Sequence, residues 1–312
     1  MQTPRDVLTP AALSMLQTIA SSGSFAAAAR DLNLVPSALT YRVRQIEDAL
    51  DVLLYDRSSR QARLTEAGAE LLREGERLLH DIDAVANRVK RVATGWESQL
   101  TVAVDTIISR ATVMELCEGF FGQSPPTRIK LRDEALSGTL QALTSGQADL
   151  AIGVALEPNT SAGVQGDALG DVRFVYAVAP HHPLATSAEP LSDTVLREHR
   201  AVAVADSVQR GSGLSFGLLG GQEVMTVATM QAKLDAQLRG LGGGFLPESM
   251  ARSYIDAGHL VERKVARPER MVHVRYAWRS AGASGHGRAL QWWLAQLQSP
   301  TTRAALLEHR GT

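Results

Sequence analysis

The sequence has almost no cysteine and no long apolar run. One cysteine among 312 residues, Cys117, allows neither an internal disulfide nor a thiolate cluster for zinc. The apolar runs, such as residues 150–156, fall short of the roughly 18 residues that a membrane-spanning helix needs. Residues 1–10 carry Arg5 and Asp6 and lack the hydrophobic stretch of a secretory leader. We therefore expect a cytoplasmic protein with no membrane partner.

The chain also lacks an excess of charge of either sign. Lysine and arginine total 32 against 33 acidic residues, so net charge says nothing about a polyanionic partner. The placement of charge is more informative, because Arg57, Arg60 and Arg63 recur at intervals of three. At this length we expect two or three compact units.

Three short helices are predicted at the start of the chain. Thr9 is a cap before Pro10, Ser24 is a cap for a helix over residues 25–32, and Pro36 suits the first turn of a third helix. Their apolar positions have helical spacing, which predicts a helix-turn-helix with Ala26 and Ala29 in its core. Residues 53–55 and 62–64 follow as two short strands around a basic turn, which predicts a wing.

A heptad pattern occupies residues 65–94, which contain no proline. Gly75 falls on one seam position and weakens the pattern, because glycine contributes no packing there. A lone helix with such a stripe needs a partner, either a second copy of the chain or the rest of the same chain. The seam consists of Leu71, Leu78, Ile82, Val85, Val89 and Val92.

Strands and helices alternate beyond residue 95, which predicts a mostly parallel sheet in two α/β lobes. We place lobe I at about 95–170 and 268–312, and lobe II at about 171–267. Proline and glycine near 157–170 and 267–268 mark the predicted crossings between the lobes.

Several segments together resemble the LysR-type transcriptional regulators. The winged-helix pattern of that family is matched by Ser22-Gly23-Ser24-Phe25, Ala28-Ala29-Arg30-Asp31-Leu32, Leu53-Leu54-Tyr55-Asp56-Arg57 and Leu64-Thr65-Glu66-Ala67-Gly68; residues 148–153 and 240–247 resemble its effector domain. The resemblance implies an α/β fold overall: an N-terminal winged helix-turn-helix (1–65), a long linker helix (66–94) and a C-terminal two-lobed, periplasmic-binding-protein-like effector domain (95–312). It also implies a sequence-specific transcriptional regulator modulated by a small-molecule co-inducer of unknown identity, with no catalysed reaction and no other cofactor.

Two positions depart from the family pattern. Val35 stands where glutamine commonly precedes the proline of the recognition helix, and Thr40 stands where serine is common. Loss of the glutamine removes a base-edge donor and acceptor, whereas Thr40 keeps a hydroxyl for phosphate. The departures therefore affect sequence preference more than DNA binding itself.

Double-stranded DNA is the predicted partner of the third helix and the wing, because an α-helix fits the major groove. The alternative for each side chain alone is an ordinary solvated surface. A dimer formed through residues 66–94 predicts an inverted-repeat operator; the resemblance adds a tetramer and admits RNA polymerase as a partner. The predicted DNA-binding residues are Ser37, Thr40, Tyr41, Arg42, Arg44, Arg57, Arg60 and Arg63.

The effector is predicted to bind beyond the carboxyl ends of the strands, in the cleft between the lobes. Helix capping is the alternative for Thr106 and Ser109, and a solvated loop acid is the alternative for Glu134. The predicted effector-binding residues are Asp105, Thr106, Ser109, Glu134, Ser207 and Thr226.

Other functional classes have weaker support. Residues 213–217 match a nucleophile elbow around Ser215, but no buried strand precedes them, which argues against a serine hydrolase. Residues 240–245 approach a dinucleotide fingerprint but follow a predicted helix. His181 and His182 are adjacent and lack further ligands for a metal. A two-lobed small-molecule binding protein without DNA function remains the alternative.

Overall fold

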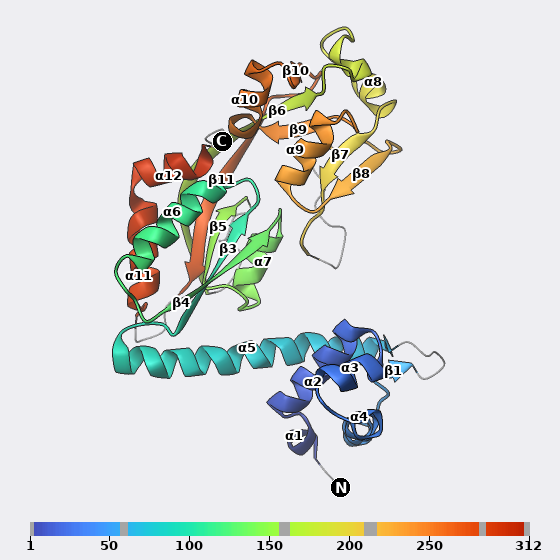
Figure 1. Ribbon diagram of the computed structural model, residues 1–312, viewed down its shortest axis with the longest axis vertical. Coiled ribbons are helices and arrows are strands. Elements are labelled where there is room, and N and C mark those ends of the chain that lie inside the picture. The colour runs from blue at the N-terminus through green and yellow to red at the C-terminus, as the bar shows by residue number, and fades with distance from the viewer. Residues whose placement is uncertain (1–2, 57–61, 156–162, 209–216, 281–284, 309–312) are drawn as a thin grey trace. The chain divides into compact units, whose positions relative to one another are not determined.

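A computed structural model describes residues 3–56, 62–155, 163–208, 217–280 and 285–308 of the chain (Figure 1). Its internal contacts divide it into two compact units, Met1–Arg88 and Val89–Thr312. The division falls inside one long helix, α5 (Glu66–Thr94). Each unit is described by itself.

The first unit is a helix-turn-helix with a wing, as predicted. Thr9 caps α2 through the backbone N–H of Ala12, and Ser24 caps α3 through that of Ala27. The short helix α1 was not predicted. The elements are α1 (Pro4–Val7), α2 (Pro10–Ser22), α3 (Phe25–Asp31), α4 (Pro36–Leu50), and the antiparallel pair β1 (Tyr55–Asp56) and β2 (Arg63–Leu64).

Apolar faces of these helices form a core of their own, which includes Leu16, Ile19 and Leu39. The buried carboxylate of Glu47 joins α4 to the wing by accepting the N–H of Leu54 at 2.9 Å. The prediction for Ala26 was wrong: it is exposed, because α3 turns Ala28 and Ala29 inward instead.

The first turns of helix α5 pack against this core. Gly75 lies against Leu13 of α2, and a Cβ at Gly75 would be 2.9 Å from Leu13 Cδ2. The glycine in the heptad pattern therefore permits a close approach of two helices. The interpretation that it packs against nothing was wrong.

One sheet runs through the second unit, in the order β10-β6-β11-β5-β3-β4, with β9 also paired to β6. The predicted parallel arrangement holds for β3 (Gln99–Asp105), β4 (Arg128–Glu134) and β5 (Leu150–Val154). The crossing segments are two long antiparallel strands, β6 (Val164–Val178) and β11 (Arg270–Arg279), so the sheet is more antiparallel than predicted.

These two strands extend through both lobes (Figure 1). Lobe I adds α6 (Arg110–Phe121), α7 (Gly138–Thr144), α11 (Arg288–Gln298) and α12 (Pro300–Leu307). Lobe II adds α8 (Asp193–Arg197), the parallel pair β7 (Ala201–Val204) and β8 (Val224–Val227), α9 (Met230–Leu238), β9 (Gly244–Pro247), α10 (Glu248–Asp256) and β10 (Val261–Arg263). Residues 240–247 are a helix end followed by a strand, which agrees with the rejection of a dinucleotide loop.

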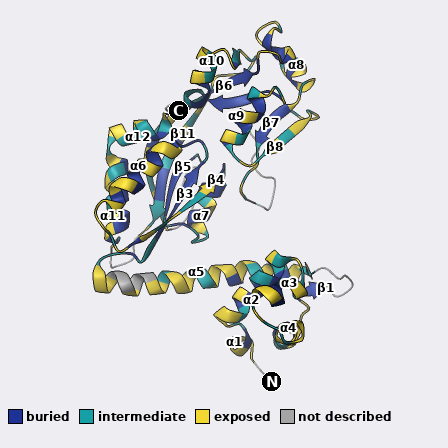
Figure 2. Ribbon diagram, viewed as in Figure 1, coloured by how far each residue is buried: buried dark blue, intermediate teal, exposed yellow. Residues whose placement is uncertain are grey.

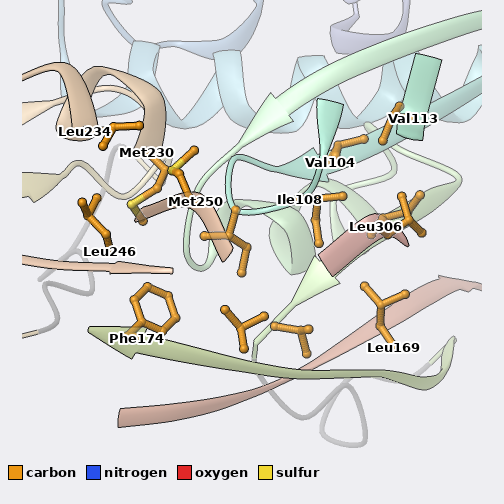
Figure 3. Packing of buried hydrophobic residues seen from close by; sticks show 14 of the residues in the cluster. Val104, Ile108, Val113, Leu169, Phe174, Met230, Leu234, Leu246, Met250 and Leu306 are labelled. Atoms are coloured by element: carbon orange, nitrogen blue, oxygen red, sulfur yellow. The ribbon is translucent and has the colours of Figure 1, made fainter. Parts of the chain in front are cut away.

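A single apolar cluster continues from lobe I into lobe II. In lobe I the cluster includes Val104, Ile108 and Leu306, and in lobe II it includes Met230 and Leu246 (Figure 3). Continuous packing of this kind resists changes in the angle between the lobes, since close-packed interiors transmit strain. Among the described helices, none is both long and apolar enough to cross a membrane.

Candidate DNA-binding surface and effector cavity

One face of α4 is exposed and polar. The opposite face is buried through Leu39, Val43 and Ile46, which fixes the rotation of the helix about its axis. The outward face then presents four of the predicted DNA-binding residues: Ser37, Thr40, Tyr41 and Arg44. Tyr41 is 63% exposed, and its hydroxyl accepts a hydrogen bond from Gln45 Nε2 at 3.2 Å.

Arg42 does not share this face. Successive helical residues are rotated by about 100°, so Arg42 lies on the flank of α4 that faces α1. There it lines a hollow of about 180 Å³ together with Asp6, Thr9 and Gln45. The structure thus separates Arg42 from the four residues with which the sequence grouped it.

The wing adds Arg63, which is exposed on β2 opposite Asp56. Arg57 and Arg60 lie outside the described residues. Thr40 donates its hydroxyl hydrogen to the carbonyl oxygen of Pro36 at 3.0 Å and must exchange this bond to donate to a phosphate.

The seam of α5 is exposed from Leu78 onward, whereas Leu71 packs against the core of the first unit (Figure 2). Its members from Leu78 onward alternate in steps of four and three residues, which is the coiled-coil spacing. Exposure rises along the helix from 46% at Leu78 to 74% at Val92. Apolar side chains in one exposed row indicate a surface that a partner covers.

A cavity of about 750 Å³ lies between the two lobes, in the size range of small-molecule sites. Lobe I contributes the carboxyl end of β3, with Asp105 and Thr106. Lobe II contributes Met230 and Lys233 of α9, and the crossing strand β11 contributes Arg270. Two of the predicted effector residues therefore line the cavity.

The other four predicted effector residues do not line it. Ser109 caps α6 by accepting the N–H of Thr112, as its alternative interpretation proposed. Glu134 is buried and paired with Arg132 at 2.9 Å, so it is not a solvated loop acid. Thr226 lies on β8 away from the lining.

Ser207 instead connects the two lobes. Its hydroxyl accepts the N–H of Ala135 at 2.6 Å and lies 3.2 Å from the carbonyl oxygen of the same residue. Beside it, Ser137 donates to both carboxylate oxygens of Asp206, at 2.8 and 2.7 Å. These contacts, which we call the interlobe latch, join the start of α7 to the end of β7.

Asp105 is fully enclosed at the edge of the cavity. Its two carboxylate oxygens accept the N–H groups of Ile107 at 3.0 Å and Leu136 at 3.1 Å. Burial raises the pKa of Asp105 to about 7; the two N–H groups oppose this shift, and the nearby carboxylates of Asp206 and Glu134 add to it.

Sequence reasoning missed Lys233 and Arg270, two of the three lysine and arginine side chains that line the cavity. Lys233 is 6% exposed, and burial lowers its pKa to about 7 with a further contribution from Arg270. Burial also lowers the pKa of Arg270. A pattern in the sequence identifies Lys233: Met230, Lys233, Leu234 and Gln237 have the i, i+3, i+4, i+7 spacing of a buried stripe, so two of its positions are polar.

Comparisons with known proteins agree with both units. The model of a bacterial regulatory helix-turn-helix protein of the lysR family matches residues 10–69, and the LysR substrate binding domain matches residues 93–300. The uncharacterized HTH-type transcriptional regulator YeeY of Escherichia coli is 37% identical over 90% of this chain and 90% of its own length.

Solved structures show the same fold. Full-length CbnR complexed with its target DNA is 18% identical, with a TM-score of 0.57, and the match covers 92% of this chain and 97% of CbnR. LysG of Corynebacterium glutamicum with bound effector Arg is 22% identical, with a TM-score of 0.51 over 97% of this chain and all of LysG. With the winged helix, the cavity and both family models in place, the chain belongs to the LysR family: it is a DNA-binding transcriptional regulator with an effector-binding domain.

Proposed function

We propose that two copies of this protein, joined along α5, each place α4 in the major groove of an inverted-repeat operator. The observation that carries the proposal is the outward face of α4, where Ser37, Thr40, Tyr41 and Arg44 stand together above a buried apolar side. Hydroxyl groups suit phosphates, and arginine suits guanine edges or phosphates. Arg63, with Arg57 and Arg60 of the wing turn, would contact flanking phosphates.

Dimerisation follows from the exposed seam of α5. Two winged helices on one coiled coil bind two half-sites, and the second contact gains from effective concentration. Effector domains would extend the assembly to a tetramer, and RNA polymerase is a further partner. This protein would act in the cytoplasm and would catalyse no reaction.

Regulation is assigned to a small-molecule co-inducer in the interlobe cavity. The effector would favour one arrangement of the lobes, because a ligand that binds two arrangements equally shifts neither. Asp105 and Thr106 line that cavity from lobe I and would contact the effector. Ser109, Glu134, Ser207 and Thr226 do not line it and would only stabilise the surrounding structure.

The test is a fluorescence anisotropy titration of the full chain against a duplex from the DNA that adjoins its own gene, with a scrambled duplex as control. We expect Arg44→Ala to weaken binding by about tenfold or more, since one good contact of this kind is worth about 1–3 kcal/mol. The matched control is Arg42→Ala, on the flank of α4, which should change affinity much less.

Salt dependence separates this proposal from a binding protein without DNA function. Phosphate contacts release counterions, so affinity should fall steeply as salt rises, and the slope should become shallower in Arg63→Ala. Equal binding of the two duplexes, or full affinity in Arg44→Ala, would contradict the proposed role of α4.

A further inference from the structure

Lys233 occupies a position that is unfavourable for a cation in two ways. It is buried, and the positive charge of Arg270 lies close enough to lower its pKa further. Among the described residues, no carboxylate contributes to the pKa of Lys233: burial and Arg270 are the causes of its shift. Such a local conflict in a folded protein points to a functional site.

The surrounding chain makes room for this lysine. Gly244 of β9 packs against its stem, where an added Cβ would be 3.1 Å from Lys233 Cε and 3.0 Å from the carbonyl oxygen of Val202. The buried lysine is thus part of the packed structure, and it belongs to the lining of the cavity.

Arg270 lies near Lys233 and is positioned by aromatic rings. Its guanidinium carbon is 4.8 Å from the centre of the Phe174 ring and 5.6 Å from that of Phe245. Cation–π contacts of this kind fix the direction of a guanidinium. Lys233 and Arg270 both line the cavity, and the charge of Arg270 contributes to the lowered pKa of Lys233.

The rest of the lining decides what kind of anion fits. Phe174 and Phe245, together with Met230, Leu136 and Val272, give the cavity an apolar wall. We propose that the cavity binds a small organic carboxylate, whose carboxylate group lies between Lys233 and Arg270 and whose apolar body lies against Phe174 and Phe245. This proposal rests on the effector role proposed above and names the chemical class of the effector.

The remaining charged groups of the lining fit the same ligand. Asp105 already accepts two backbone N–H groups, so it is a poor partner for a ligand amine. The carboxylate oxygen Oδ1 of Asp171 lies 2.5 Å from Nδ1 of His273. Arg275 is a third cationic side chain of the lining. A bound carboxylate would relieve the repulsion between Lys233 and Arg270, and the lowered pKa of Lys233 records the cost of leaving that charge buried.

The experiment is a thermal-shift screen of the full chain, followed by calorimetry, with matched pairs of probes. Each pair contains a carboxylate and its neutral amide: benzoate and benzamide, cinnamate and cinnamamide, octanoate and octanamide. Benzamidine tests the opposite charge, and inorganic phosphate tests an anion without an apolar body. We expect at least one of the carboxylates to raise the melting temperature, and its amide, benzamidine and phosphate to have no comparable effect.

Variants then connect the shift to the two cations. Lys233→Met keeps the length of the side chain and removes its charge. We expect it to lower the affinity for the carboxylate by about tenfold or more, and we expect the same of Arg270→Leu. Lys130→Met, on an exposed position of β4, is the matched control and should leave affinity unchanged.

The proposal is overturned if none of the carboxylates binds, if an amide or benzamidine binds as tightly as its carboxylate, or if phosphate alone gives the full shift. Unchanged carboxylate affinity in both Lys233→Met and Arg270→Leu also overturns it. The DNA titration on the same preparations is independent of these outcomes. Intact DNA binding without a carboxylate site would therefore reject the ligand class and leave the proposed DNA-binding role in place.

Discussion

At the scale of single residues, two groups in the cavity have their charged forms disfavoured by burial. Asp105 and Lys233 each have a pKa of about 7, shifted up from 3.8 and down from 10.5. The unfolded chain binds more protons at Lys233 than the folded chain between pH 7 and 10.5, so this group makes stability rise with pH in that window. Asp105 has the opposite effect between pH 3.8 and 7, where the folded chain binds more protons.

We therefore expect Lys233→Met to be more stable than the natural chain at pH 6.5, on the order of a few kcal/mol, because each pKa unit corresponds to about 1.4 kcal/mol. The difference should shrink at pH 9.5, where Lys233 is already neutral in the folded state. Urea unfolding followed by tryptophan fluorescence measures this, since Trp96, Trp278, Trp292 and Trp293 all lie in the second unit. A pH-independent difference would show that the charge of Lys233 is not the cause.

At the scale of elements, α5 has two roles, one in its first turns and one in its later turns. Its first turns pack on the winged helix, where Gly68 lies so close to the carbonyl oxygen of Leu54 that a Cβ would clash with it. Its later turns present the exposed seam. The start of α5 thus belongs to the core of one chain, and its continuation is available to another.

Gly68→Ala should destabilise the first unit by a few kcal/mol, since backbone atoms of Leu54 cannot move aside as a flexible side chain can. Alanine in a helix would otherwise gain about 1 kcal/mol. Thermal unfolding followed by circular dichroism measures the change. Gly220→Ala, with open space around it, is the control, and equal melting curves for all three proteins would contradict the predicted clash.

Val85→Glu should dissociate the proposed dimer, because it places a charge in the middle of the seam. Ala86→Glu adds the same charge one residue away, off the seam, and should leave the dimer intact. Light scattering after size-exclusion chromatography gives the mass directly. A dimeric Val85→Glu protein would show that copies of the chain associate elsewhere.

At the scale of the whole molecule, the structure joins the two lobes of the second unit by the crossing strands and by the interlobe latch. The latch connects Ser137 with Asp206 and Ser207 with Ala135, beside the cavity. Each of these hydrogen bonds is worth about 1 kcal/mol, which is small against the packing of the core but large enough to shift an equilibrium between lobe arrangements.

The double variant Ser137→Ala, Ser207→Ala should exchange amide hydrogens faster around residues 135–138 and 205–208 and should bind the cavity ligand several-fold more weakly. Ser187→Ala removes an exposed hydroxyl that bonds only its own turn, and it should do neither. Hydrogen-exchange mass spectrometry provides the readout. Unchanged exchange in the double variant would exclude the latch as a restraint on the lobes.

Local patterns sufficed for the elements whose determinants lie close together in the chain. The caps at Thr9 and Ser24, the proline at the start of α4 and the spacing of the seam depend on neighbours within one or two turns, so the winged helix and α5 were predicted from the sequence. The outward position of Thr40 and Tyr41 followed from the apolar stripe of the same helix. The place of Arg42 on the flank of α4 could not be predicted, because its neighbour, α1, was not predicted.

The cavity depended on contacts between distant segments. Asp105 and Thr106 were predicted because the end of a buried strand is a local feature, whereas Arg270 joins Lys233 only when β11 and α9 meet across the lobes. Ser207 was predicted to bind the effector. In the structure its hydroxyl accepts a hydrogen bond from the backbone N–H of Ala135, 72 residues away in the chain. The sequence by itself therefore determined the helices α2 to α5, the wing and the family. Which charges face one another was decided by the tertiary structure, because strand pairing and interlobe packing set those distances.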